Sequence, residues 1–202
     1  MSSPYLAPIE RPKGLVMKLI YFFMRRQFGK AAARTFMVFP PRMPFAFTRF
    51  YMKSYALDKK LTLSRELQAL IREQVASTNG CLFCMDAGRY YALKSQVTDA
   101  ARFDALPEYR SSALFNEPER AALDYATELT KEKHVAPETF DRLARFYSER
   151  EICDIVWLVA SEHLNNMTNI GLGIGSDGFC ELAQRGREEG IRRPPLTSEI
   201  NA

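Results

Sequence analysis

Apolar residues that recur every three or four positions most constrain how this chain can fold. Leu63, Leu67, Leu70, Ile71 and Val75 repeat at that spacing, which is the period of an α-helix with one buried face. No stretch of the chain alternates apolar and polar residues between turn signals, as a half-buried strand would. The sequence therefore predicts an all-α protein built from amphipathic helices.

Residues that satisfy free backbone groups mark the ends of these helices. Thr62 is the expected N-cap of the first periodic helix, and Gly80 tolerates the left-handed conformation that ends it. Ser148 and Glu151 have the spacing of a capping box, in which each side chain accepts from the other's backbone N–H. The helix that follows, over residues 152–170, is apolar around most of its circumference. We expect it to be the buried central element.

The first sixty residues differ from the rest of the chain in charge. They contain 12 Lys and Arg against Glu10 and Asp58, a balance of +10, whereas the remainder has 16 basic and 22 acidic residues, a balance of −6. A chain of 202 residues is long enough for one domain with an appended arm. We therefore predict a basic, aromatic-rich N-terminal helical arm over residues 1–60 and a helical domain over residues 61–202.

The charge of the arm limits the kinds of partner that it can have. A segment of +10 can meet nucleic acid, an anionic membrane or the acidic body of its own or a neighbouring subunit. We expect the arm to pack through Phe and Tyr residues on that acidic body, and we predict neither a nucleic-acid nor a membrane partner. Residues 15–55 carry more bulky aromatics than a small arm can bury alone, which predicts a homo-oligomer.

Cys81 and Cys84 form a Cys-x-x-Cys motif at the start of the helix that follows Gly80. Free N–H groups in a first helical turn favour a thiolate, and one turn brings two cysteines within reach of a disulfide, so a redox dithiol is the leading interpretation and inert cysteines the alternative. A zinc site needs four ligands, and no paired set completes one. We predict no metal and no cofactor. The other possible zinc ligands, Cys153, Cys180, His134 and His163, do not occur in closely spaced pairs. We expect Cys153 and Cys180 to be buried.

The run Asn79-Gly80-Cys81-Leu82-Phe83-Cys84 resembles the hallmark motif of the AhpD-like, carboxymuconolactone decarboxylase superfamily, in its peroxidase-related branch. A looser resemblance extends over residues 60–175. The resemblance implies an AhpD-like helical bundle that assembles as a homo-oligomer, with alkylhydroperoxidase activity in the best-known members. It also implies that Cys84 meets the peroxide and Cys81 resolves it, whereas the helix terminus favours the thiolate on Cys81. The order of the two thiols stays open.

The chain departs from the family pattern at three positions. The family's His four residues after the second Cys is Gly88, the His between the cysteines is Phe83, and the relay Glu is Ala69. Glu73 lies four residues closer to the motif, a shift that rotates a helical side chain by only about 40° and advances it by about 6 Å. Glu73 is therefore the candidate proton relay, and a solvated helix carboxylate is the alternative.

Two further polar residues bear on the candidate site. His163 lies on the central helix, where we expect it to be at least partly buried, either as a hydrogen-bonded core residue or in the place of the absent His. Asp86 lies about 160° around its helix from Cys84, so we expect a surface or interface position. The predicted catalytic residues are Cys81, Cys84, Glu73 and His163.

These observations predict a cytoplasmic thiol-disulfide redox protein, with peroxide reduction through the Cys-x-x-Cys pair as the leading activity. Its expected partners are a peroxide or disulfide substrate, a dithiol reductant and further copies of the chain. One alternative is a carboxymuconolactone decarboxylase-like enzyme, which would rely on polar acid-base groups rather than on a dithiol. The other is a non-catalytic oligomer in which the pair senses the redox state.

Overall fold

A computed structural model describes residues 4–28 and 34–179 of the chain, so Cys180 lies outside the described residues. The described part is helical and contains no strand, which confirms the predicted all-α fold class. The α-helices are α1 (Leu15–Phe28), α2 (Arg34–Val38), α3 (Pro44–Ala46), α4 (Met52–Asp58), α5 (Arg65–Asn79), α6 (Leu82–Lys94), α7 (Ala100–Asp104), α8 (Glu117–Glu132), α9 (Pro137–Ala144) and α10 (Glu149–Gly171). A π-helical turn, η1 (Phe47–Tyr51), joins α3 to α4, and a 3₁₀ turn, η2 (Leu106–Glu108), follows α7.

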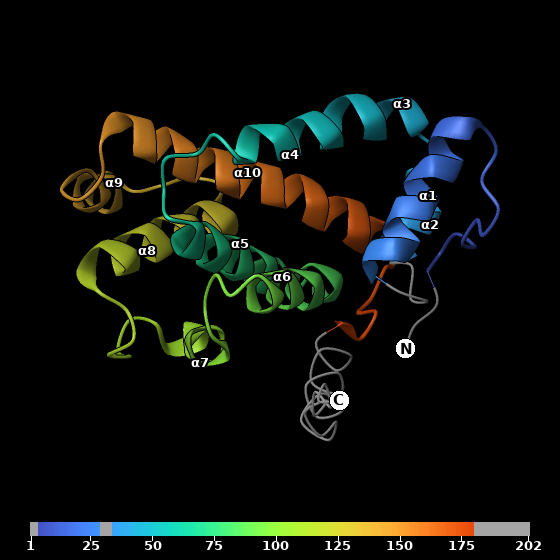
Figure 1. Cartoon of the computed structure of the whole chain (residues 1–202). Coiled ribbons are helices and arrows are strands. Elements are labelled where there is room, and N and C mark those ends of the chain that lie inside the picture. The colour runs from blue at the N-terminus through green and yellow to red at the C-terminus, as the bar shows by residue number, and fades with distance from the viewer. Residues whose placement is uncertain (1–3, 29–33, 180–202) are drawn as a thin grey trace, which may run out of the picture.

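The main core lies where α10 packs against α5 and α8. Figure 1 shows α10 crossing the molecule, with α5, α6 and α8 on one side of it and α4 on the other. Of the apolar side chains of α5 that recur at helical spacing, Leu67, Ile71 and Val75 enter this core, as their period predicts. Leu70 packs in a second cluster with Phe103 and Leu123. Fully buried members of the main core include Ile71, Val75, Leu143, Ile155 and Leu158.

Capping residues fix where the principal helices begin and end. Ser148 and Glu151 form the predicted capping box at the start of α10, and Gly80 ends α5 with a φ of 71°. The prediction for Thr62 is wrong, because Ser64 caps α5. Thr62 instead donates through both its backbone N and its hydroxyl to Asp154, each at 2.7 Å. This contact ties the start of α5 to α10.

Helix α10 is less completely buried than its composition predicts. One face enters the core, but Val156, Leu164 and Met167 on the opposite face are 39%, 38% and 50% exposed. Cys153 is also exposed, so its predicted burial is wrong. The reason is geometric: residues three or four apart share one face of a helix, and this face points away from α5 and α8.

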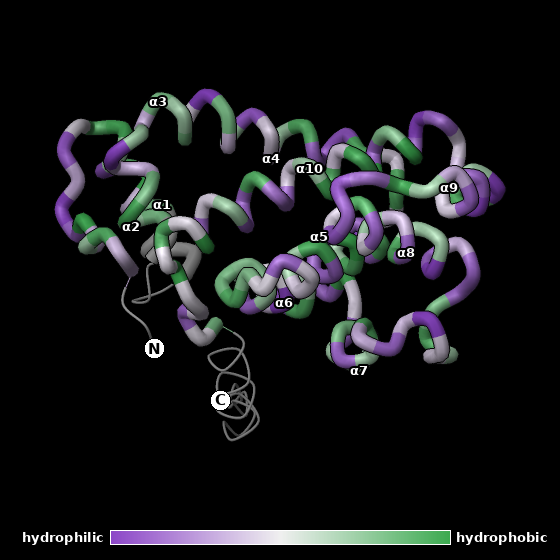
Figure 2. Tube along the Cα trace, turned by 180° about the vertical axis from the view of Figure 1, so that it is seen from behind, coloured by the Kyte–Doolittle hydropathy of each residue, from purple (hydrophilic) through white to green (hydrophobic). Residues whose placement is uncertain are grey.

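The N-terminal segment contacts the body at several places along its length. Val38 of α2 is fully buried in a cluster with Cys81, Phe83 and Phe179, and the Tyr51 hydroxyl lies 2.9 Å from that of Thr168 on α10. Figure 1 places α1 and α2 beside the C-terminal end of α10, while α3 and α4 run along it. Seen from behind, the same segment shows hydrophobic stretches along α3 and α4 (Figure 2). The helices α3, η1 and α4 contain no buried residue.

The lengths and hydropathy of the helices also bear on membranes. Within residues 4–28 and 34–179, none of the helices combines the length and the low charge that spanning a bilayer requires.

Candidate functional site

The turn between α5 and α6 places both cysteines of the motif. Gly80 adopts a left-handed conformation that reverses the chain, and the Cys81 N–H donates to the Ala76 carbonyl at 2.9 Å. Cys81 then serves as the N-cap of α6, where its sulfur accepts from the Cys84 N–H at 3.3 Å. The two cysteines, whose Cα atoms are 5.3 Å apart, form a disulfide. The helix terminus therefore supplies N–H donors to the sulfur at its start.

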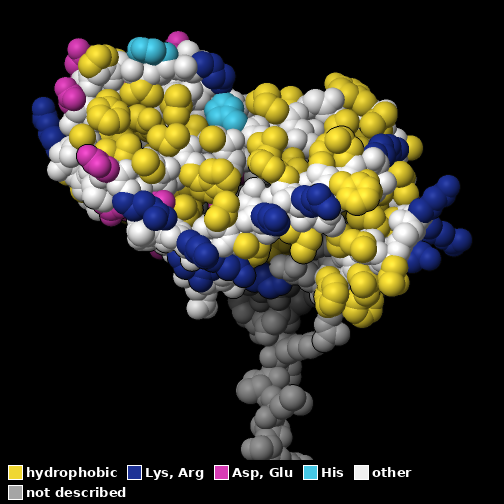
Figure 3. Space-filling model, turned by 90° about the horizontal axis from the view of Figure 1, so that it is seen from above, with side chains coloured by type: hydrophobic (Ala, Val, Ile, Leu, Met, Phe, Trp, Pro, Cys, Tyr) yellow, Lys and Arg dark blue, Asp and Glu magenta, His cyan; other side chains and the backbone are white. Residues whose placement is uncertain are grey.

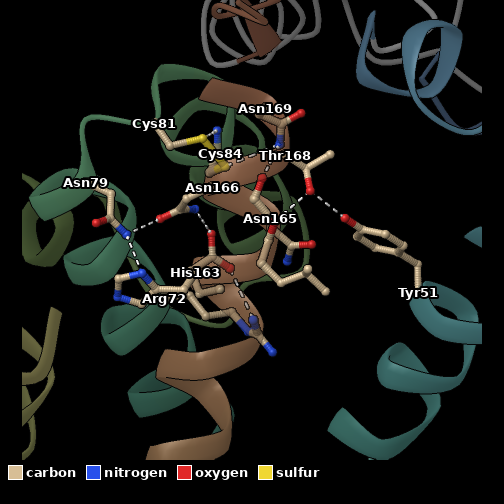
Figure 4. Close-up of a disulfide and its surroundings, with 12 residues drawn as sticks. Tyr51, Arg72, Asn79, Cys81, Cys84, His163, Asn165, Asn166, Thr168 and Asn169 are labelled. Atoms are coloured by element: carbon tan, nitrogen blue, oxygen red, sulfur yellow. Dashed lines mark hydrogen bonds and ion pairs between the residues drawn. A yellow bond between two sulfur atoms is a disulfide. The ribbon is translucent and has the colours of Figure 1, made fainter. Parts of the chain in front are cut away.

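The two sulfurs of the pair have different surroundings. Cys81 is 1% exposed, whereas Cys84 is only partly buried. The Asn169 side-chain amide of α10 lies 3.5 Å from the Cys84 Sγ, within the range of a weak N–H···S contact. Figure 4 shows Asn169 reaching toward the pair from the last turns of α10. Of the two sulfurs, Cys84 is thus the one that a reactant from solvent can approach.

Apolar and aromatic side chains enclose the disulfide on the remaining sides. The cluster draws residues from α2, α6 and the segment after α10, so elements far apart in sequence meet at the pair. This environment is poor in water and favours contact with the apolar part of a reactant. Its members are Phe36, Val38, Phe83, Ala87, Tyr90, Tyr91, Leu172, Ile174 and Phe179.

Glu73 is a buried carboxylate of α5 that faces α6. It is 3% exposed, which excludes the alternative of a solvated helix carboxylate. Its Oε1 accepts from Arg89 Nε at 2.6 Å, and its buried Oε2 has no hydrogen-bond partner among the described residues. A Cβ added at Gly88 would lie 3.8 Å from that Oε2. Since position 88 follows Cys84 by one helical turn, Glu73 lies about one turn along α6 from the exposed sulfur.

Burial controls the protonation of this carboxylate. Desolvation raises the pKa of Glu73 to about 7, with a smaller contribution from the negative charge of Glu162, although the hydrogen bond and the charge of Arg89 oppose the rise. Arg89 is itself held in place by Asp104 at 3.0 Å. A carboxyl group with this pKa exchanges a proton near neutral pH, which a relay requires.

His163 lies on α10 but contacts neither sulfur of the pair through a hydrogen bond within the described chain. Its Nδ1 is 3.4 Å from Asn79 Nδ2, and Figure 4 shows its ring turned toward Asn79. Burial, together with the positive charge of Lys133, lowers the pKa of His163. The ring is therefore mostly neutral at pH 7.

A row of polar residues on α10 faces this site and was not among the predicted site residues. Asn166, which is fully buried, accepts from Asn79 at 2.8 Å and donates to Glu162 at 2.6 Å. Glu162 in turn pairs with Arg72 at 3.1 Å. The spacing of positions 162, 166 and 169, which are polar and lie three or four residues apart on α10, is the sequence signal that could have identified this row.

Asp86 is not at the surface, contrary to the sequence-based expectation. It is 9% exposed and accepts from the Ser176 hydroxyl at 2.8 Å and from the Phe179 N–H at 2.9 Å. The segment that follows α10 folds back over α6, and this segment covers the face that would otherwise meet solvent. Asp86 therefore fastens one wall of the apolar cluster around the disulfide. In the part of the chain described, no three His, Cys, Asp or Glu residues gather as metal ligands would.

No protein-family model matches the chain. The uncharacterized protein YnjA of Escherichia coli is 25% identical over 150 residues, which cover 71% of this chain and 80% of YnjA. Among solved structures, a cysteine variant of the debrominase Bmp8 in complex with 2,3,4-tribromopyrrole has a TM-score of 0.71 at 21% identity, over 88% of this chain and 95% of the other.

A second solved structure, described as an alkylhydroperoxidase AhpD core, is an uncharacterized peroxidase-related protein from Ralstonia eutropha. It has a TM-score of 0.64 at 20% identity, over 86% of this chain and 96% of that protein. The structural neighbours are thus AhpD-like proteins, and their likeness extends over most of the helices described above. The chain has the AhpD-like fold.

Proposed function

We propose that this protein is a thiol-disulfide oxidoreductase that reduces organic hydroperoxides through Cys81 and Cys84. The observation that supports it most is the asymmetry of the pair, in which a partly exposed Cys84 contacts Asn169 and a buried Cys81 lies one turn away. One thiol is open to an oxidant, and the other is protected until the first has reacted. This is the arrangement that an attacking and a resolving thiol require.

The reaction consumes one peroxide bond and two thiols. The Cys84 thiolate attacks the outer peroxide oxygen, the O–O bond breaks, and the alkoxide leaves as the alcohol after it takes a proton. Cys84 is then a sulfenic acid, and the Cys81 thiolate displaces water from its sulfur to form the disulfide. An external dithiol reduces that disulfide by exchange and is itself oxidised to a disulfide. Such a cycle fits the reducing cytoplasm that the sequence predicts.

Glu73 and Asn169 have separate roles in this proposal. Glu73, whose raised pKa is about 7, accepts the thiol proton in its ionised form and returns it to the leaving alkoxide through a bridging water. Asn169 donates an N–H to the Cys84 sulfur and so favours the thiolate on that residue. His163 orients Asn79 beside Asn166 and does not touch the reacting atoms.

The surroundings of the pair support an organic substrate over hydrogen peroxide. Phe36, Phe83 and Tyr90 belong to the cluster that contains both cysteines, and such side chains bind an apolar substituent better than a small hydrophilic oxidant. A halogenated aromatic is a second electrophile that suits this cluster, as in the complex of Bmp8 with 2,3,4-tribromopyrrole. Cys84 would take the bromine, the ring carbon would take a proton, and Cys81 would displace bromide to form the same disulfide.

Replacing either cysteine tests whether the pair turns over. We expect wild type to consume cumene hydroperoxide continuously with dithiothreitol as reductant, whereas Cys84→Ser falls to the buffer rate because no thiolate remains at the open position. Cys81→Ser should turn over more slowly than wild type, because its sulfenic acid has no resolving thiol and must be reduced by dithiothreitol directly. Peroxide loss is followed by a dye assay, with exposed Cys153→Ser as the matched control. Equal rates in wild type and Cys84→Ser would exclude the proposed activity.

The pH dependence of thiol oxidation tests Glu73. Glu73 accepts a proton only when ionised, so its contribution appears as the pH rises through about 7 and is lost below it. In Glu73→Gln, the rate of oxidation should follow the ionisation of the thiol alone, with a pKa of about 8.5. We therefore expect the variant to be slower by roughly 10-fold at about pH 7.5 and nearly equal to wild type at about pH 9.5. Glu66→Gln, which removes another α5 carboxylate paired with an arginine, is the control. Equal slowing at both pH values would assign Glu73 a structural role.

Gly88→His tests whether the unpartnered Glu73 oxygen limits the relay. The added Cβ meets only Glu73 Oε2, at an ordinary contact distance of 3.8 Å, so an imidazole at position 88 can donate to that oxygen. We expect the rate of peroxide reduction at neutral pH to rise about tenfold, because the ring places a second proton carrier one turn from Cys84. Gly88→Ala, which supplies the Cβ without the ring, should leave the rate unchanged. A gain in both variants would point to helix rigidity instead.

A further inference from the structure

Helix α1 turns most of its apolar side chains away from the rest of the molecule. Met17 and Tyr21, which are 3% and 6% exposed, face inward, and the Tyr21 hydroxyl donates to the Ile9 carbonyl at 2.6 Å. Because these two inner residues are four positions apart, they share one face of the helix and fix which side meets solvent. The solvent side, called the α1 stripe below, consists of Leu15 at 73%, Val16 at 58%, Leu19 at 49%, Phe22 at 61% and Phe23 at 61% exposure.

The α1 stripe is the reverse of what a surface helix normally shows, because such a helix turns its apolar face to the core. At about 100° per residue, the stripe occupies an arc of about 120° opposite Met17 and Tyr21. At about 200 Å² for a large side chain, its exposed fractions amount to on the order of 600 Å². This single helix therefore reaches the upper end of the roughly 300–600 Å² found for the largest apolar patch on a typical monomer, which indicates a binding surface.

Positive charge surrounds the α1 stripe. Lys13 and Lys18 are exposed, and Glu10 is the only acidic residue before Asp58. Asp58 is itself paired with Arg72 of α5 at 2.7 Å. Figure 3 shows Lys and Arg at the end of the molecule formed by the N-terminal segment, whereas the acidic side chains visible in that view lie toward the end that carries α9. We therefore expect the partner of the N-terminal end to be anionic.

We propose that α1 binds the surface of an anionic lipid bilayer, with the α1 stripe inserted at the boundary between headgroups and acyl chains. Helices that bind in this way combine an apolar face with nearby Lys and Arg, so burial of apolar area and attraction to anionic headgroups act together. Stable attachment commonly takes two such signals, and α1 provides both. Nucleic acid would match the charge, but its phosphate backbone offers no apolar phase for Leu19 or Phe22.

The orientation of α1 removes the basis of the expectation that the arm has no membrane partner. That expectation assumes that the Phe and Tyr residues of the arm pack on the acidic body. Tyr51 does contact α10 through Thr168, but Phe22 and Phe23 lie on the exposed side of α1. Within the described chain, the aromatic residues of α1 therefore leave an apolar surface among basic residues.

Helix α1 lies at the end of the molecule that contains the disulfide. Figure 1 places α1 beside the C-terminal end of α10, where Asn169 contacts Cys84. Helix α2, the next helix along the chain, contributes Val38 to the cluster around the pair. A bilayer at α1 therefore adjoins the end of the molecule that carries Cys84. On the function proposed above, on which this step rests, hydroperoxides of the acyl chains of that bilayer are the organic substrates.

Sedimentation with vesicles tests the docking of α1, which does not depend on the chemistry of the pair. We expect wild type to sediment with vesicles of phosphatidylcholine mixed with phosphatidylglycerol, and much less with phosphatidylcholine alone. Leu19→Asp and Phe22→Asp should each lower the partition coefficient at least about tenfold, because a carboxylate resists transfer into the acyl boundary. Leu114→Asp, at a residue 48% exposed between η2 and α8, is the control, and circular dichroism verifies folding. No binding of wild type, or equal binding of both stripe variants, would overturn the proposal.

Phe23→Trp provides a second readout that keeps the α1 stripe apolar. Insertion should shift the emission of the added Trp to the blue, and lipids brominated on their acyl chains should quench it, whereas Leu114→Trp should show neither effect. Trp157, the only native Trp, contributes to both variants alike. Emission that is already blue without lipid, and that vesicles leave unchanged, would mean that another protein surface covers α1 and would contradict the proposal. Wild type that binds duplex DNA but no vesicle would assign the charge to nucleic acid instead.

Two peroxides separate the docking from the chemistry. Leu19→Asp should slow the loss of phosphatidylcholine hydroperoxide carried in anionic vesicles by at least about tenfold, because the variant is no longer concentrated at the bilayer. The loss of cumene hydroperoxide in solution should be the same in Leu19→Asp and wild type. Equal rates of the two proteins on the vesicle substrate would refute delivery from the bilayer. Wild type that consumes neither peroxide would refute the proposed chemistry, while the sedimentation result would still decide the docking.

Discussion

The packing of α10 against α5 and α8 is the contact on which the rest of the structure depends. Its apolar face fills the main core, and Ile155 and Leu158 are completely buried there. The same helix carries Asn166 and Asn169 on a neighbouring face, where they reach the turn that holds the cysteines. A helix that is fixed in rotation by its core therefore also fixes the amide donors beside Cys84. The site inherits its geometry from hydrophobic packing.

This arrangement buries several polar side chains, and most of them have hydrogen-bond partners within the chain. Asn166 and Glu162 exchange hydrogen bonds with neighbours, so their burial leaves few unmet donors or acceptors. Glu73 is one of the exceptions, because its Oε2 is buried without a hydrogen bond, as are Arg102 Nε and Thr130 Oγ1. An unpaired buried oxygen disfavours the charged carboxylate, which is the physical reason that the pKa of Glu73 rises to about 7. The unpaired oxygen and the protonation range near neutral pH therefore have the same origin, which is burial.

Local patterns in the sequence predict the helices and the placement of the cysteines, because these depend on neighbours along the chain. The all-α fold, the capping box at Ser148 and the left-handed Gly80 follow from such patterns. The position of Asp86 does not, because its burial depends on a segment more than 85 residues away that folds back onto α6. The predicted burial of Cys153 was wrong for a related reason. Periodicity identifies which residues share a helix face, but only the packing of the fold decides whether another element covers that face. The helical spacing of the polar residues on α10 can be read from the sequence, but the contact of Asn169 with Cys84 is apparent only in the structure.

The central claim is that Cys84 attacks a peroxide and Cys81 resolves the product, and a single turnover tests it most directly. Fully reduced protein, freed of reductant, is mixed with one equivalent of cumene hydroperoxide, and the alcohol is quantified alongside the mass of the peptide that contains the pair. The account predicts about one alcohol per chain, together with a loss of about 2 Da from that peptide as the disulfide forms. A disulfide that forms without alcohol, or alcohol that forms while both thiols stay reduced, would contradict it.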